Sequence, residues 1–269
     1  LGTKHAAFAK FTALGTLVNT IGLEVAPLLF SSLFGLQVAG FFGLVSRVLG
    51  IPATFLGGAI AQVFYPEASR RAQSGEAASL VSALARGLVV TSALGFGLLS
   101  IFAGPLFVFV FGPDWEEASL YAIIMCPAFA AKLVSTPLAS FAWIAGRQRT
   151  QLLVSFGTTG LRLIGLIAGA RVGGALGSVV GLAGAGVIIS AAYTNWMFSL
   201  AGVSRLRWLR ESAPALLLTL LILTGSFALS LAFGRHWWAA LALSVGPAAW
   251  LVVRELRAAP PPKPRSDEP

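Results

Sequence analysis

The chain of 269 residues has few charged side chains, and few of those are acidic. It holds 10 Asp and Glu against 19 Lys and Arg. Charged residues make up 11% of the sequence, where a soluble domain normally carries about 25%. Hydrophobic residues make up 57%, and the net charge is +9. This composition excludes an ordinary soluble domain, and it leaves the excess of positive charge to be explained.

Metal ligands and nucleophiles are equally scarce. The two histidines, His5 and His236, lie far apart, and Cys126 is the one cysteine, so we expect no metal site and no intrachain disulfide. No P-loop and no G-x-S-x-G elbow occurs, and outside the C-terminal tail carboxylates cluster only in the short stretch 114–117. The sequence therefore predicts no catalytic residue and no cofactor, and we do not expect an enzyme.

The chain has instead a series of long apolar stretches. A helix needs about 20 apolar residues, at a rise of about 1.5 Å each, to cross a bilayer. By that criterion the sequence predicts an all-α polytopic bundle of about eight transmembrane spans, at 11–34, 38–65, 84–104, 118–142, 151–170, 176–200, 213–233 and 236–253.

The positive charges fall in every second gap between these spans. The basic gaps are 66–83, 143–150 and 201–212, together with both tails, whereas the other gaps hold only Arg171 and Arg235. By the positive-inside rule, the basic loops and both ends of the chain are cytoplasmic. Because the charge is spread loop by loop, it predicts contact with anionic lipid headgroups and no nucleic-acid partner. We expect the stretch 66–87 to form an amphipathic helix on the inner membrane surface.

Four ionisable residues lie inside the predicted spans, where a charge is unfavourable by several kcal/mol unless it faces a cavity or a partner. Glu24 follows Asn19 in the first span and either makes a helix–helix hydrogen bond or lines a cavity. Arg47 either reaches the outer surface or faces the bundle interior, where its guanidinium could bind phosphate through two hydrogen bonds. We favour the interior for Arg47. Lys132 lies in mid-span between two prolines, too deep for its ammonium to reach water.

The fourth residue, Arg162, completes a polar stripe along one helix. Ser155, Thr158 and Thr159 precede it at helical spacing, so the four side chains share one face. Such a stripe faces either another helix or water.

Glycines recur every four residues across the fifth and sixth predicted spans. Helices in lipid associate through close backbone approach along small residues, so this repeat predicts a tight hairpin of the two spans. The repeat consists of Gly165, Gly169, Gly173, Gly177 and Gly181.

Two blocks of sequence resemble a known family. VAGFFGLVSRVLGIPATFLGGAIAQVFYPEASR at 38–70 and FGPDWEEASLYAIIMCPAFAAKLVSTPLASFAWIAGRQRTQLL at 111–153 are similar to the lipid-linked oligosaccharide flippases of the MOP superfamily. Members of that family have two six-helix lobes with a cavity between them. The resemblance implies that 1–200 is the second lobe, that 201–257 forms two additional transmembrane helices, and that the N-terminal lobe is missing. The absence of an initial Met agrees with a fragment, and the proline-rich stretch 258–269 predicts a disordered tail.

The function implied by the resemblance is movement of an undecaprenyl-pyrophosphate-linked oligosaccharide across the bacterial inner membrane by alternating access. Buried cations suit a pyrophosphate, which makes Arg47, Lys132 and Arg162 the candidate substrate-binding residues. Some relatives couple transport to sodium or protons, and the candidate ligands here are Asn19, Glu24, Thr158 and Thr159.

Two rival functions stay open. A multidrug antiporter of the same superfamily moves organic cations and would need carboxylates in its cavity, whereas three buried cations and one carboxylate favour an anionic substrate. A membrane-embedded polymerase or ligase of polysaccharide assembly would need a large outer loop with basic residues. The longest outer loop predicted here, 105–117, is acidic.

Overall fold

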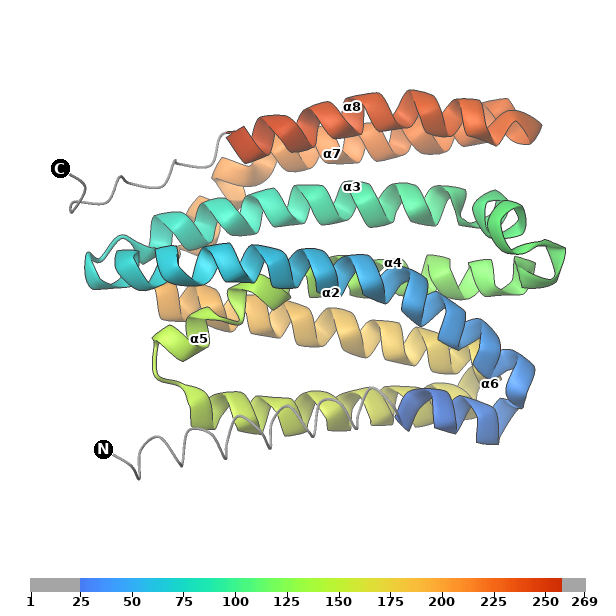
Figure 1. Cartoon of the computed structure of the whole chain (residues 1–269), viewed down its shortest axis with the longest axis horizontal. Helices are drawn as coiled ribbons and strands as arrows, with labels where there is room; N and C mark the ends of the chain where they lie inside the picture. Colours follow the sequence, from blue (N-terminus) through green and yellow to red (C-terminus); the bar gives the residue numbers. More distant parts are fainter. Residues whose placement is uncertain (1–24, 258–269) are drawn as a thin grey trace.

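Helices make up nearly all of the chain that the computed structural model describes, residues 25–257, and no strand occurs in that range (Figure 1). A helical segment, Val25–Phe34, precedes the first labelled helix. The labelled elements are, in order, α2 (Leu36–Gln73), α3 (Ala77–Phe111), η1 (Pro113–Trp115), α4 (Glu116–Leu138), α5 (Phe141–Ile144), α6 (Gln148–Ala201), α7 (Arg205–Phe233), η2 (Gly234–His236) and α8 (Trp237–Arg257).

The helices run up and down along one long axis, with α4 at the centre of the main bundle (Figure 1). α4 packs against α2, α3 and α6, and half of the side chains in its apolar stretch are buried. α7 and α8 pack against each other and against α3, so they form a layer on one side of the bundle. The chain therefore has a main bundle from α2 to α6 and a lateral pair beside it.

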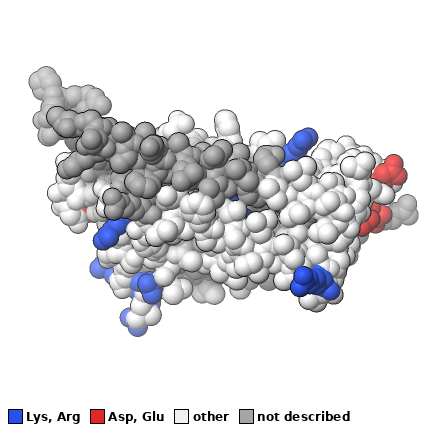
Figure 2. Space-filling model, turned by 90° about the horizontal axis from the view of Figure 1, so that it is seen from below, with Lys and Arg blue, Asp and Glu red and all other residues white. Residues whose placement is uncertain are grey.

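The two ends of the bundle differ in charge. At one end, which we call the acidic end, α3 passes through η1 into α4, with Asp114, Glu116 and Glu117 in the first turns. The turns from α2 to α3 and from α6 to α7 lie at the opposite, basic end (Figure 1). Figure 2 shows a face that is mostly uncharged, with acidic atoms gathered mainly at one end. An uncharged belt between charged ends is what a bilayer requires of a spanning bundle.

The predicted fold class is confirmed. Six helices within residues 25–257 are long and apolar enough to cross a membrane, and one of them, α6, contains both the fifth and the sixth predicted spans. The predicted first span, 11–34, is described only from Val25 onward. The other predicted spans correspond to α2, α3, α4, α7 and α8.

The expectation of a surface helix at 66–87 was wrong. α2 continues through Pro66 to Gln73, the chain turns within 74–76, and α3 then begins at Ala77. Gly75 allows the turn because its φ of 74° is favoured only for glycine. Glu67 forms ion pairs with Arg70 and Arg71 on the same helix. These pairs stabilise the helical turns beyond the end of the span predicted at 38–65.

The predicted glycine hairpin is confirmed. α6 loses helical geometry at Gly173 and Gly174, where φ is −144° and 59°, and its two arms then run side by side in opposite directions (Figure 1). A Cβ atom at Gly165 would lie 2.5 Å from the carbonyl oxygen of Gly181, and Gly169 and Gly177 oppose each other in the same way. The arms therefore meet backbone to backbone, an approach that only glycine allows.

Candidate functional site

The structure brings two of the predicted cationic residues together. Lys132 lies on α4 and Arg162 on the first arm of α6, and the two are close enough for their charges to interact electrostatically. Both side chains are half-buried. Like charges repel where the dielectric constant is low, so the two cations influence each other.

An aromatic ring lies beside the Lys132 ammonium. The ammonium lies 5.6 Å from the centre of the Phe129 ring, which is one turn earlier on α4. Ser135 and Thr136 donate hydrogen bonds to the Lys132 carbonyl oxygen at 3.2 and 2.8 Å. Both hydroxyl protons bond the backbone, and the lysine side chain makes its cation–π contact with Phe129.

The polar stripe that leads to Arg162 is also largely satisfied by its own helix. Ser155 donates to the Gln151 carbonyl oxygen at 3.0 Å, and Thr158 donates to the Ser155 carbonyl oxygen at 2.9 Å. The hydroxyl of Thr159 differs, because it is buried and has no hydrogen-bond partner among the residues that the structure describes. A buried hydroxyl left unpaired is unfavourable by about 1–3 kcal/mol. Thr159, three residues before Arg162, therefore has a donor to offer to a bound group.

Arg47 occupies a different position from the pair. It is exposed on α2, on the face opposite Val45 and Leu49, both of which are buried against the rest of the bundle. The structure therefore does not place this side chain in the packed interior of the described chain. An exposed arginine in the apolar belt faces either lipid or a polar surface outside residues 25–257.

The helix register places Arg47 at the same depth as Arg162. Gly50 packs against Phe129 of α4, and Gly186 of the second arm of α6 packs against Ala128. Counting residues along α2 from the first contact puts Arg47 level with one turn of α4. Counting along the second arm of α6 from the second contact, and then across the glycine hairpin, puts Arg162 level with the same turn. Lys132 lies six residues further toward the basic end, which is about 9 Å. All three cations thus fall within a narrow band of depth.

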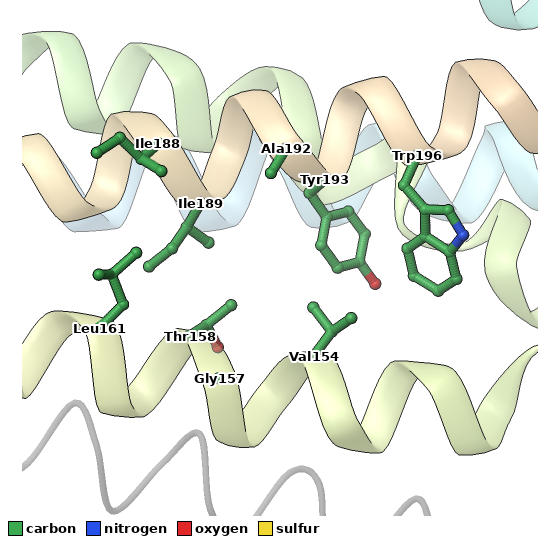
Figure 3. Close-up of a pocket in the computed structure, with 9 residues that line it drawn as sticks. All are labelled: Val154, Gly157, Thr158, Leu161, Ile188, Ile189, Ala192, Tyr193 and Trp196. Carbon is green, nitrogen blue, oxygen red and sulfur yellow. The ribbon is translucent and has the colours of Figure 1, made fainter.

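The other candidates for coupling-ion ligands, Asn19 and Glu24, lie outside the described residues. Thr158 lines a pocket of about 270 Å³ between the two arms of α6 (Figure 3). No group of three or more His, Cys, Asp or Glu side chains comes together within residues 25–257.

Sequence reasoning missed several polar contacts that join distant parts of the chain. Glu255 of α8 is buried, and it pairs with Arg86 of α3 at 3.4 Å and with Arg254 at 2.7 Å. The Trp208 indole of α7 donates to the Ser82 carbonyl oxygen at 3.1 Å. These contacts attach the lateral pair to α3 at the basic end. Arg86 and Glu255 are more than one hundred residues apart, as are Ser82 and Trp208, so no local pattern could reveal these two contacts.

Comparison with protein families gives one match for part of the chain. Residues 3–120 match the model of a family described as polysaccharide biosynthesis protein. The matched range includes α2, α3 and Arg47, whereas Lys132 and Arg162 lie beyond it. Comparisons with curated proteins and with solved structures give no match.

Proposed function

We propose that this multi-pass membrane chain, whose residues 3–120 match the polysaccharide biosynthesis protein family, moves a lipid-linked oligosaccharide across the bacterial inner membrane. The substrate class is an undecaprenyl-pyrophosphate-linked sugar unit, and transport proceeds by alternating access. The main bundle, with the segment before α2, acts as one lobe of the transporter, and α7–α8 are additional helices. The positive-inside rule places the basic end in the cytoplasm.

The observation that carries the proposal is the close pair of Lys132 and Arg162 inside an apolar bundle. A pyrophosphate with two negative charges is attracted to two neighbouring cations in an apolar bundle. The planar guanidinium of Arg162 suits two parallel hydrogen bonds to phosphate oxygens, while the ammonium of Lys132 adds a point charge. Thr159 can donate its unpaired hydroxyl to the same group.

Arg47 completes the proposed site from α2. Its exposed position and its depth suit a residue that lines a cavity between this bundle and a second lobe. In that arrangement the pyrophosphate meets Arg47 when the cavity is open and meets the Lys132–Arg162 pair deeper in the bundle. The oligosaccharide occupies the cavity and the lipid tail stays in the bilayer.

An anionic substrate fits this chain better than an organic cation. The apolar stretches of α2 to α8 contain no carboxylate, because every Asp and Glu within residues 25–257 lies at or near a helix end. A cation antiporter needs at least one acid in its cavity, and Glu24 of the predicted first span is the one candidate against the three cations Arg47, Lys132 and Arg162.

The test uses single substitutions in the host that produces the polysaccharide. Lys132→Met and Arg162→Ala should each abolish surface polysaccharide while lipid-linked oligosaccharide accumulates in the membrane, because translocation stops after synthesis. Arg47→Ala should also abolish surface polysaccharide. Arg47→Lys should restore export only in part, because the lysine ammonium cannot form the two parallel hydrogen bonds of a guanidinium. Arg171→Ala, at the exposed turn of the same helix α6, is the matched control and should export normally.

A stability measurement separates a binding role from a structural one. Because Lys132 is a half-buried cation in an apolar bundle, Lys132→Met should leave the melting temperature unchanged or raise it while it stops export. Wild-type export by both Arg47→Ala and Lys132→Met would overturn the anion site and the preference for a flippase over a drug antiporter. Single sugar units that reach the surface but stay unpolymerised would instead indicate a polymerase.

A further inference from the structure

The two arms of α6 separate toward the basic end and leave a slot between them. Near the turn the arms touch at Gly165 and Gly181, but further along they diverge (Figure 3). The slot has a volume of about 270 Å³ and lies between 154–161 of the first arm and 188–196 of the second. Gly157 and Ala192 leave the space open, and a Cβ atom at Gly157 would meet nothing within 4 Å.

The walls of the slot offer almost nothing to a polar ligand. Leucine, isoleucine and valine side chains from both arms point into it (Figure 3). Its two hydroxyls are already engaged as donors, since Thr158 bonds the Ser155 carbonyl oxygen and Tyr193 bonds the side-chain oxygen of Gln151. A sugar or a nucleotide would lose hydrogen bonds to water here and gain few in return. The ligand that fits is a hydrocarbon chain.

The slot is open along one edge. Ile188 at its edge is 60% exposed, so the space is continuous with the surroundings of the helix pair. Both arms belong to an apolar helix long enough to cross a bilayer, whose interior consists of lipid chains. The side chains that line an empty apolar gap lack van der Waals partners on one side. An acyl chain that enters the gap supplies those contacts.

One end of the slot suits a headgroup. Tyr193 and Trp196 close it toward the basic end, with their rings edge to face at 5.5 Å, and such side chains prefer the headgroup level of a membrane. Arg147 is exposed one helical turn before Gln151. From Val154 to Leu161 the slot extends about 10 Å along the helix, within the roughly 15 Å of one leaflet.

We infer that the α6 slot binds one acyl chain of an anionic phospholipid, whose headgroup lies at the basic end near Gln151 and Arg147. The inference needs only that α6 spans the membrane, so it stands or falls separately from the proposed function. The bound chain fills the gap that the glycine contacts cannot close, and it thereby supports the helix that carries Arg162.

Photo-cross-linking tests the inference. The full chain is reconstituted in phosphatidylcholine vesicles that contain a small fraction of phosphatidylglycerol with a diazirine on its acyl chain, and cross-linked peptides are identified by mass spectrometry. Adducts should concentrate on 154–161 and 188–196, and unlabelled phosphatidylglycerol should compete for them at least fivefold better than added phosphatidylcholine.

Two glycines of the same arm provide the variant and its matched control. Gly157→Phe fills the slot and should lower the adducts at least fivefold, whereas Gly160→Phe, also with open space around it but outside the slot, should leave them unchanged. If Gly157→Phe does not fold, Ala192→Leu fills the slot from the other arm. The inference is wrong if adducts spread evenly over all the helices, if neutral lipid competes equally, or if only a polyprenyl phosphate competes, which would make the slot a site for the substrate tail.

Discussion

The α6 hairpin and the lateral pair α7–α8 are both antiparallel helix pairs in the same membrane, yet they are held in different ways. In α6 the contacts run from backbone to backbone, with Gly165 against Gly181 and Gly169 against Gly177. The lateral pair is attached by side chains. Leu223 of α7 covers Gly97 of α3, and Glu255 of α8 pairs with Arg86 of α3.

The difference matters because the two kinds of contact respond differently to change. A side chain can move or be shortened, so a contact that it makes can be repaired by a second substitution. A carbonyl oxygen of a helix cannot move without breaking the helix. The rigid hairpin also carries Arg162, whereas the apolar stretches of α7 and α8 hold no charged residue. The helix that carries the candidate site is therefore also the one held by backbone-to-backbone contacts.

The largest expected effect comes from Gly169→Leu. The new side chain would overlap the carbonyl oxygen of Gly177, so the arms must separate and most of the folded protein should be lost. The amount of monodisperse protein in detergent measures the loss. Gly225→Leu in α7, where a Cβ atom would meet nothing within 4 Å, is the control and should be tolerated. Normal abundance of Gly169→Leu would show that the glycine repeat does not hold the hairpin.

A smaller effect is expected at the contact between α3 and α7. Gly97→Ala would place its Cβ atom 2.7 Å from a methyl carbon of Leu223, and the overlap should destabilise the protein by about 1–3 kcal/mol. Adding Leu223→Ala should recover part of that loss, because the second change removes the overlapping atoms. Gly169→Ala should have no such rescue, since Gly177 has no side chain to shorten. Thermal unfolding of the single and double variants measures the rescue. If Leu223→Ala does not recover stability in Gly97→Ala, the side-chain contact is no easier to repair than the backbone contact.

Removal of the buried carboxylate should have a smaller effect still. Glu255→Gln leaves Arg86 without its partner on α8, and because Arg86 is partly exposed the loss should be about 1 kcal/mol. Glu211→Gln, which breaks an exposed pair with Arg207 within one helix, is the matched control and should change the melting temperature little. If both changes lower it equally, the link from Glu255 to Arg86 does not hold the lateral pair.

Labelling of single cysteines tests orientation without any expected change in stability. Cys126 is buried and should stay unlabelled in the parent protein. An impermeant maleimide applied to intact cells should label Trp115→Cys, at the acidic end, but neither Gln73→Cys nor Arg207→Cys at the basic end. Labelling of position 73 or 207 from outside would reverse the proposed orientation and both leaflet assignments.

Several features of the fold were accessible from the sequence because they depend on local patterns. Long apolar runs predicted the membrane helices, and the four-residue repeat of glycines predicted the hairpin of α6. Helix ends were predicted less well. α2 and α3 extend beyond the spans expected at 38–65 and 84–104, because ion pairs such as Glu67 with Arg71 stabilise helical turns outside the hydrocarbon.

The candidate site shows where local patterns stop being informative. Each buried cation could be found in the sequence, because a charge in an apolar run stands out. That Lys132 and Arg162 form a pair depends on how α4 packs against α6, and that Arg47 lies on the outer face of α2 depends on which side α4 covers. The link from Gln151 to Tyr193 joins the two arms across 42 residues.

The amino-acid sequence by itself determined that this protein is an all-helical membrane bundle with one basic and one acidic end, because hydrophobicity, charge and glycine spacing act over a few turns of helix. Only the tertiary structure decided which cations meet, which hydroxyl stays unpaired and where the arms of α6 leave a slot. Those features depend on distances of a few ångströms between residues far apart in the chain, and such distances follow from the packing of whole helices.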